Sequence, residues 1–354
     1  MTSQDLSKSN LNNSWATRKK TFQPKAINLS QENLIEVSYL QPGEMLPLVI
    51  QPKLEDFNLK DWIENDLEFV ETNLLKHGGI LFRGFKVNTQ VHFEQFISSV
   101  CSQLMPYMEG ATPRTKLSNT VYTSTEFPPD QTIALHNELS YVITWPMKIW
   151  FFCVQPATQG GETPIADVRK VYQRIHPRIK ERFSEKGWML VRNFGYGFGP
   201  SWQAAFHITD TTLLAEYCHN ASIDFEWKDS QHLRTRSCRP AIAKHPKTGE
   251  MLWFNHIAFW HVSSLELKLR ETLLAEFSEE ELPYNTYYGD GSPIEASVIE
   301  EIREAYLQET VVFPWQEGDI LMLDNMLVAH GRNPYVGQRK ILVTMGEPMS
   351  RRNI

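Results

Sequence analysis

The spacing of hydrophobic residues predicts helices near the beginning of the chain and a buried strand between them. Apolar residues at helical spacing predict a helix over residues 57–76, which Gly78-Gly79 would end. The apolar run 80–82 predicts a short buried strand, and residues 91–104 again show helical spacing. The first hundred residues therefore alternate between the two kinds of element.

Strands dominate the prediction for the middle of the chain. We expect strands at 132–136 and 147–154, separated by Trp145-Pro146. The second is apolar at nearly every position, which is typical of a strand covered on both faces. Asp167 is placed to cap a helix that runs through Tyr172.

The last part of the chain returns to the same mixture. Amphipathic helices are predicted at 265–281 and 293–308, and strands at 320–323, 327–330 and 340–345. Many short strands, with helices at the start and inserted late, predict a mainly β fold with added helices, either a sandwich or a jelly roll.

Composition excludes several classes of protein. The 354 residues are 42% hydrophobic and carry a net charge of −7, which argues against a nucleic-acid-binding surface. The four cysteines are scattered without a Cys-x-x-Cys spacing, so we expect reduced thiols rather than disulfides or a zinc site. No apolar run is long enough to span a membrane. We therefore expect a cytoplasmic protein with a polar mobile arm over residues 1–23 and a single domain over 24–354.

A metal site is indicated by three residues far apart in the chain. His136 and Glu138 are two positions apart, so on an extended strand both side chains leave the same face. His330, in Ala329-His330-Gly331-Arg332, would complete a set of two histidines and one carboxylate. Such a set binds one face of a ferrous ion and leaves the other face open. A His-x-Glu tripeptide alone also arises by chance in a chain with 11 histidines.

Two further residues suit the far carboxylate of a 2-oxo acid cosubstrate. Arg339 follows His330 by nine positions, and adjacent antiparallel strands would bring it close to the metal. The planar guanidinium group pairs with a carboxylate through two parallel hydrogen bonds. Thr163, after Gly160-Gly161-Glu162, offers a hydroxyl donor. Each residue on its own is equally typical of a solvated arginine or of a turn.

Taken together, these motifs resemble the taurine dioxygenase/TfdA family of iron(II)- and 2-oxoglutarate-dependent oxygenases. The resemblance covers about residues 75–345 and is strongest at 120–170 and 311–346. It implies a double-stranded β-helix, a cupin-like jelly roll, that uses Fe(II) as cofactor and 2-oxoglutarate and O2 as cosubstrates. By the same resemblance the metal ligands are His136, Glu138 and His330, while Arg339 and Thr163 bind 2-oxoglutarate.

Within the family, the segments 123–128, 288–293 and 339–343 are most similar to the SyrP-type branch, which hydroxylates amino acids or amino-acyl groups in natural-product synthesis. The resemblance thus implies hydroxylation of an unactivated C–H bond in an amino-acid-type small molecule, either free or tethered to a carrier protein. Val343 stands where some members have a second arginine for an anionic substrate, so a sulfonate such as taurine is not expected. Desaturation or cyclisation remain alternatives, as does a non-catalytic jelly-roll binding protein.

Other residues near these motifs have two interpretations each. Arg114 and Asn119, on a loop before the metal strand, and Asn255, in an aromatic run, are candidate substrate contacts. His256 and His261 in the same run could line the pocket, but packed core histidines are the expected state. Arg332 is expected to form a structural ion pair with Asp324. The sequence does not indicate an oligomeric state.

Overall fold

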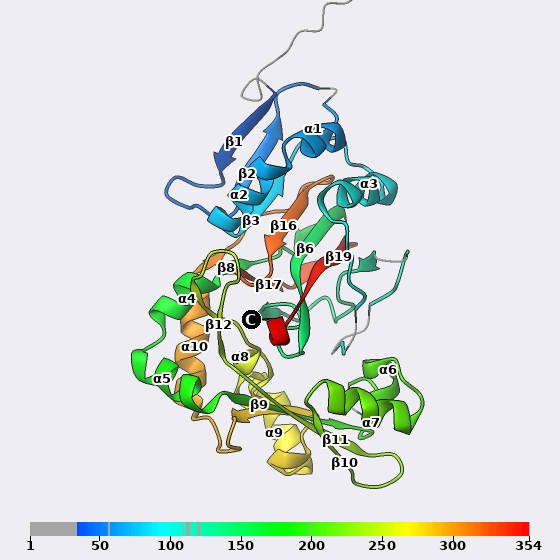
Figure 1. Ribbon diagram of the computed structural model, residues 1–354, viewed down its shortest axis with the longest axis vertical. Helices are drawn as coiled ribbons and strands as arrows, with labels where there is room; N and C mark the ends of the chain where they lie inside the picture. Colours follow the sequence, from blue (N-terminus) through cyan, green and yellow to red (C-terminus); the bar gives the residue numbers. More distant parts are fainter. Residues whose placement is uncertain are drawn as a thin grey trace, which may run out of the picture.

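A computed structural model describes residues 34–353 except 56, 108, 111–113, 119–120 and 198 (Figure 1). The predicted arm over residues 1–23 lies outside the described residues. Among those that are described, no helix is both long and apolar enough to cross a membrane. Two β-sheets form the centre of the molecule, and helices and a third sheet surround them.

The larger central sheet has seven strands. Its order is β1 (Ile35–Tyr39), β2 (Leu48–Pro52), β3 (Gly79–Phe82), β16 (Ile320–Asp324), β6 (Thr144–Gln155), β19 (Lys340–Ser350) and β4 (Tyr122–Thr123). The long strand β6 pairs antiparallel with β16 on one side and with β19 on the other. It is buried over most of its length, as its nearly continuous apolar run predicts.

The second central sheet carries the predicted metal strand. Its order is β15 (Thr310–Val311), β8 (Ile165–Asp167), β17 (Val328–Arg332) and β5 (Ile133–His136). Apolar side chains of both sheets belong to one core cluster, which includes Phe151 of β6 and Ile165 of β8. The two sheets thus pack face to face and remain open at their edges. The predicted mainly β fold is confirmed.

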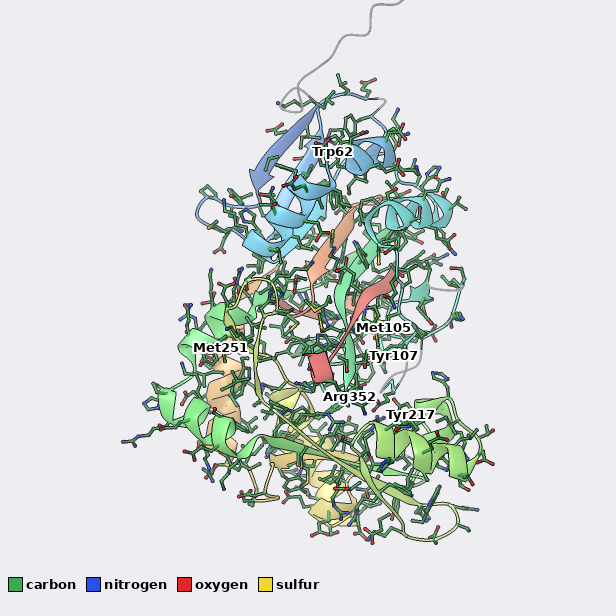
Figure 2. The ribbon with its side chains drawn as sticks, viewed as in Figure 1. Trp62, Met105, Tyr107, Tyr217, Met251 and Arg352 are labelled. Carbon is green, nitrogen blue, oxygen red and sulfur yellow. The ribbon has the colours of Figure 1, made fainter. Side chains whose placement is uncertain are left out.

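Helices α1 (Leu59–Asn65), α2 (Leu67–His77) and α3 (Gln90–Val100) pack on the outer face of the large sheet. Their core includes Trp62, which is labelled in Figure 2. The single helix predicted over 57–76 is wrong in one respect, because it is interrupted at Asp66. The backbone of Asp66 leaves the helical region, and this residue ends α1 and begins α2. Gly78, with φ of 78°, ends α2 as predicted.

Helices α4 (Val168–Arg174), α5 (Pro177–Lys186) and α10 (Ala296–Gln308) pack along one side of the molecule (Figure 1). Asp167 caps α4 as predicted, since its side chain accepts a hydrogen bond from the Arg169 backbone N–H. Pro146 was predicted to separate two strands but lies inside β6. Pairing of β6 with β16 stops at Lys148, so Pro146 has only β19 as a neighbour, and a missing N–H is tolerated there.

A third sheet forms the end of the molecule opposite the helices α1 to α3 (Figure 1). Its order is β10 (Asp224–Trp227), β11 (Leu233–Arg239), β9 (Trp188–Phe194) and β14 (Tyr284–Tyr288). Around it lie α6 (Trp202–Phe206), α7 (Thr211–Asn220), α8 (Ile257–Trp260) and α9 (Leu267–Glu276). Two short pairs complete the fold, β12 (Ile242–Lys244) with β13 (Met251–Trp253) and β7 (Gln159–Gly160) with β18 (Tyr335–Val336).

Candidate active site

The two predicted histidine ligands face each other across neighbouring strands. His136, the last residue of β5, is the direct cross-strand partner of His330 in β17. Their ring centroids lie 4.5 Å apart. We had expected Glu138 to lie on the same extended strand as His136. It lies instead in the turn that follows β5. Even so, one ligand atom of each of the three side chains lies within 4.8 Å of the others.

Asn325 explains why Glu138 can leave the strand and still face the histidines. Its side-chain oxygen accepts the Glu138 backbone N–H at 2.7 Å, and its amide nitrogen donates to the Glu138 carbonyl at 2.9 Å. The same nitrogen also donates to the carbonyl of Pro146 at 2.8 Å. Asn325 is fully buried. The turn that carries the carboxylate ligand is therefore clamped by a side chain from the end of β16.

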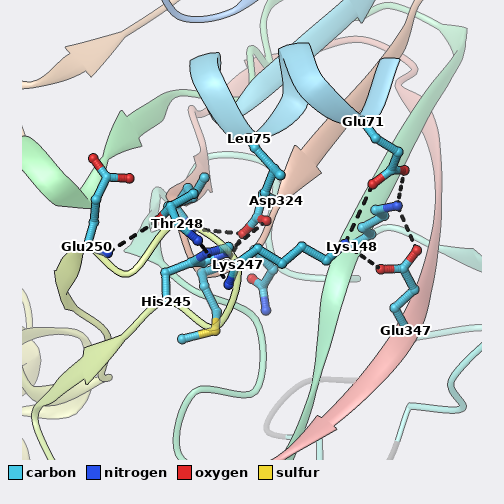
Figure 3. A network of polar contacts seen from close by, with 12 residues as sticks. Glu71, Leu75, Lys148, His245, Lys247, Thr248, Glu250, Asp324 and Glu347 are labelled. Atoms are coloured by element: carbon cyan, nitrogen blue, oxygen red, sulfur yellow. Dashed lines mark hydrogen bonds and ion pairs between the residues drawn. The ribbon is translucent and has the colours of Figure 1, made fainter. Parts of the chain in front are cut away.

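Asp324 and His245 hold the segment that contains Asn325 (Figure 3). One carboxylate oxygen of Asp324 accepts the backbone N–H of Met326 and of Leu327, and the other lies 3.1 Å from His245 Nε2. On the neighbouring strand β6, the ammonium group of Lys148 contacts two glutamates, as Figure 3 shows. The contacts of Asp324 thus fix the segment that carries Asn325.

The donor set fits a divalent metal ion. His136 Nδ1 lies 2.9 Å from the carbonyl oxygen of Ala134, so the ring donates there and keeps the lone pair of Nε2 for a metal. Burial and the neighbouring His330 lower the pKa of His136 to about 4, so the ring is neutral at neutral pH. His330 Nε2 lies 3.5 Å from Glu138 Oε2. Two imidazoles and one carboxylate, supplied from one side, match a facial two-histidine, one-carboxylate site.

Arg114 lies directly against this site. Its Nη2 donates to Glu138 Oε2 at 2.8 Å, and its guanidinium group stacks 4.2 Å from the ring centre of Tyr107. Burial raises the pKa of Glu138, but the charge of Arg114 and the hydrogen bond with His330 outweigh burial and hold that pKa well below its usual range. Glu138 is therefore ionised, as metal binding requires.

The two other candidate substrate contacts have different positions. Asn119 lies outside the described residues. Asn255 is buried, its amide nitrogen donates to the carbonyl of Ala241 at 2.8 Å, and its oxygen accepts the Ile257 backbone N–H at 3.0 Å. Its side chain therefore holds the chain around α8 in place and does not line the cavity described next.

One cavity connects the metal ligands with the predicted cosubstrate residues. It is lined by Arg114, Ser124, Thr125, Ile133, His136, Phe151, Thr163, His330, Gly331, Arg332, Arg339 and Val343. Arg339 lies just before β19, whereas His330 is in β17, and these strands belong to different sheets. The expected route through adjacent strands is therefore wrong, and the proximity arises because the two sheets face each other.

Arg339 is a half-buried cation held by neutral groups. Its Nε donates to the Gly161 carbonyl at 2.8 Å, and its Nη2 lies 3.5 Å from Thr163 Oγ1. Burial lowers its pKa to about 10, which still leaves it charged at neutral pH. Gly161 has φ of 74°, and a side chain there would come within 3.0 Å of Arg339 Cδ. The turn before Thr163 thus allows the arginine to approach closely.

Trp315 and Ser124 complete this end of the cavity, and the sequence analysis had given neither a role. Trp315 Nε1 donates to Thr163 Oγ1 at 3.1 Å, and Arg339 Nη1 donates to Ser124 Oγ at 3.3 Å. With two donors on its oxygen, the Thr163 hydroxyl is left to donate its own proton. The only available signal for Trp315 was its place in the motif Trp315-Gln316-Glu317-Gly318-Asp319.

The predicted ion pair between Arg332 and Asp324 is wrong, because Asp324 is engaged by His245. Arg332 instead donates to backbone carbonyls of the segment before β5; the acceptors belong to Phe127, Pro128 and Gln131. His256 and His261 are both buried, and neither lines the cavity. The His256 ring lies 5.3 Å from that of His136 and supports it from behind.

Comparison with known proteins agrees with this geometry. The family model described as taurine catabolism dioxygenase TauD, TfdA family matches residues 36–345. The dapdiamide synthesis protein DdaC from Enterobacter agglomerans is 40% identical over 280 residues, which cover 79% of this chain and 85% of DdaC. A clavaminate synthase-like protein from Arabidopsis thaliana is 30% identical over 293 residues, which cover 80% of this chain and 86% of the plant protein.

Solved structures share the fold. PvcB from Pseudomonas aeruginosa, described as an Fe, alpha-ketoglutarate dependent oxygenase from an isonitrile synthetic pathway, aligns with a TM-score of 0.54. The alignment covers 92% of this chain and 96% of PvcB at 15% sequence identity. Together with the two facing sheets, this likeness confirms the predicted jelly roll.

Proposed function

The chain belongs to the taurine catabolism dioxygenase TauD, TfdA family, and from this premise we propose that it hydroxylates an unactivated C–H bond of an amino acid or amino-acyl group. It is a dioxygenase that uses Fe(II) as cofactor and 2-oxoglutarate and O2 as cosubstrates. The metal ligands in this proposal are His136, Glu138 and His330.

The observation that carries the proposal is the single cavity shared by two kinds of residue. His136 and His330 line it together with Arg339 and Thr163. A metal-binding protein without turnover would need the three ligands but not a half-buried arginine and a free hydroxyl proton beside them. This combination favours an oxygenase over a non-catalytic binding protein.

Each residue has a distinct task in the proposed reaction. Bound Fe(II), together with 2-oxoglutarate and O2, supplies the oxidising chemistry. Arg339 binds the far carboxylate of 2-oxoglutarate through its guanidinium group, and Thr163 donates a hydroxyl proton to the same carboxylate. Phe151, whose ring lies 5.0 Å from that of His330, and Val343 cover the inner wall and keep water away.

The substrate class rests on sequence similarity. DdaC is named for the synthesis of a dapdiamide, and its 40% identity supports a role for this chain in amino-acid-related secondary metabolism. We propose hydroxylation as the outcome, on a substrate that is either free or bound to a carrier protein. Desaturation or cyclisation would use the same ligands and the same cosubstrate residues.

Two measurements test the proposed function. Mixing the purified protein with Fe(II) and 2-oxoglutarate in the absence of air should give a weak visible charge-transfer band. In air, a panel of amino acids and their carrier-bound forms should stimulate succinate release, with the product identified by mass spectrometry. No absorption band and no binding of 2-oxoglutarate would identify the chain as a binding protein instead.

A further inference from the structure

Arg114 has hydrogen-bonding capacity that the protein itself does not use. Its side chain is 5% exposed and lines the cavity. Nη2 is occupied by Glu138, but Nε and Nη1 are both buried and have no hydrogen-bond partner among the described residues. Leaving the N–H groups of a buried cation unsatisfied is costly, so such groups usually indicate a missing ligand.

The charges around the cavity favour a negatively charged ligand. Three arginines line it, Arg114, Arg332 and Arg339, and none of the described residues that line it is an aspartate or glutamate. Arg332 is engaged by three backbone carbonyls, and Arg339 has the cosubstrate role proposed above. Among the described residues, Arg332 has one buried donor without a partner, its Nε, whereas Arg114 has two, Nε and Nη1.

A charge count for the loaded site gives the same result. A ferrous ion and the 2-oxoglutarate dianion cancel each other. Glu138 cancels the charge of one arginine, so Arg114, Arg332 and Arg339 together leave two positive charges around the cavity. A carboxylate on the substrate would balance one of them, and buried charges are tolerated when they are paired.

We propose that Arg114 is a substrate-recognition residue that binds a carboxylate of the substrate while it also holds Glu138. The inference rests on the proposed function and specifies its substrate class as a molecule with an unmasked carboxylate close to the oxidised carbon. Val343 stands where some members of the family have a second arginine, and Arg114 supplies the cation from a different element, the segment before β4. An amino-acyl thioester would need a second carboxylate to use this contact.

The test uses acetate as a probe and acetamide as its neutral isostere. The enzyme is loaded with Mn(II), a redox-stable paramagnetic ion, and with 2-oxoglutarate in the absence of air. Because Arg114 touches a metal ligand, acetate bound to it lies close to Mn(II), and its methyl protons relax faster. We expect strong relaxation of acetate and little of acetamide in the wild-type protein.

Variants test whether Arg114 causes the faster relaxation of acetate. Arg114→Gln should weaken acetate binding about tenfold or more, and Arg114→Lys should retain part of it. The control is Lys116→Gln, which removes the same charge from an exposed residue of the same segment and should change nothing. Circular dichroism checks that each variant is folded.

Several results would overturn the inference. If acetate relaxation persists in Arg114→Gln, acetate binds the metal directly and Arg114 only balances the charge of Glu138. If the wild-type protein does not distinguish acetate from acetamide, no carboxylate site exists, and this result needs no variant. If Mn(II) or 2-oxoglutarate fails to bind the wild-type protein, the proposed function itself is wrong.

Discussion

Asn325 should control metal affinity although it is not a ligand. In Asn325→Ala, the N–H and the carbonyl of Glu138 and the carbonyl of Pro146 all lose their side-chain partner in a fully buried place. Each buried group left unpaired costs roughly 1–3 kcal/mol, so the free energy of unfolding should fall by at least about 3 kcal/mol. Loss of a group that orients a ligand typically weakens metal binding about 10–100-fold.

Asn193 offers a matched control. It is also buried, its amide nitrogen donates to the carbonyls of Glu280 and Leu282 at 2.9 and 2.7 Å, and its oxygen accepts from Arg234 Nε at 2.8 Å. Asn193→Ala therefore removes the same number of hydrogen bonds from the third sheet, away from the metal ligands. It should lose stability without losing metal affinity.

Urea denaturation of the metal-free proteins measures stability, and calorimetric titration with Mn(II) measures metal affinity. The prediction requires that both variants are destabilised and that only Asn325→Ala binds Mn(II) more weakly. A folded Asn325→Ala protein with wild-type Mn(II) affinity would refute the reasoning, because Glu138 would then be held without its clamp.

Three further predictions concern the ligands, the cosubstrate and the pH dependence. Glu138→Ala should abolish iron binding and turnover, as should the corresponding changes of His136 and His330; an iron-loaded, fully active Glu138→Ala enzyme in metal analysis would contradict the assignment. Arg339→Ala should raise the KM for 2-oxoglutarate about thirtyfold or more, because a buried charge pair is worth roughly 2–5 kcal/mol; an effect on the KM of the substrate alone in steady-state kinetics would exclude the cosubstrate role. Burial lowers the pKa of His261 to about 4, whereas the pKa in the unfolded chain is near 6.5. Between pH 6.5 and pH 4 the unfolded state therefore binds a proton that the native state does not, and the free energy of unfolding should decrease as the pH falls through this range. In His261→Gln this decrease should be smaller by up to about 3 kcal/mol, measured by urea denaturation at pH 7 and pH 4.5. An equal decrease in the wild-type protein and the variant would show that His261 does not contribute.

The sequence predicted which candidate residues lie together better than it predicted the backbone that carries them. His136, His330, Arg339 and Thr163 line one cavity, as their motifs suggested. What failed was the local geometry, since Glu138 lies beyond the strand and Arg339 comes from the opposite sheet. Spacing along the chain gives the face of a strand, but it does not show which strands share a sheet.

Errors in the elements have similar physical causes. Hydrophobic spacing continues through Asp66, so periodicity cannot show that the helix breaks there. Pro146 was predicted to separate two strands, as proline usually does. It lies instead within β6, beyond the residues that pair with β16. The partner of Arg332 was chosen by charge, whereas backbone carbonyls are invisible in a sequence.

The position of β5 at the margin of its sheet has a consequence for handling the enzyme. This strand has four residues, and among the described strands β17 is its only neighbour in the sheet. His136 and His330 come from the two strands, so an ion held between them would fasten β5 to β17 as a crosslink does. Amide hydrogens of Ile133–His136 should then exchange with solvent more slowly in the loaded protein. Metal occupancy would thus determine the local stability of this edge strand. In metal-depleted preparations β5 would open more often and become accessible to proteases and to pairing with other chains.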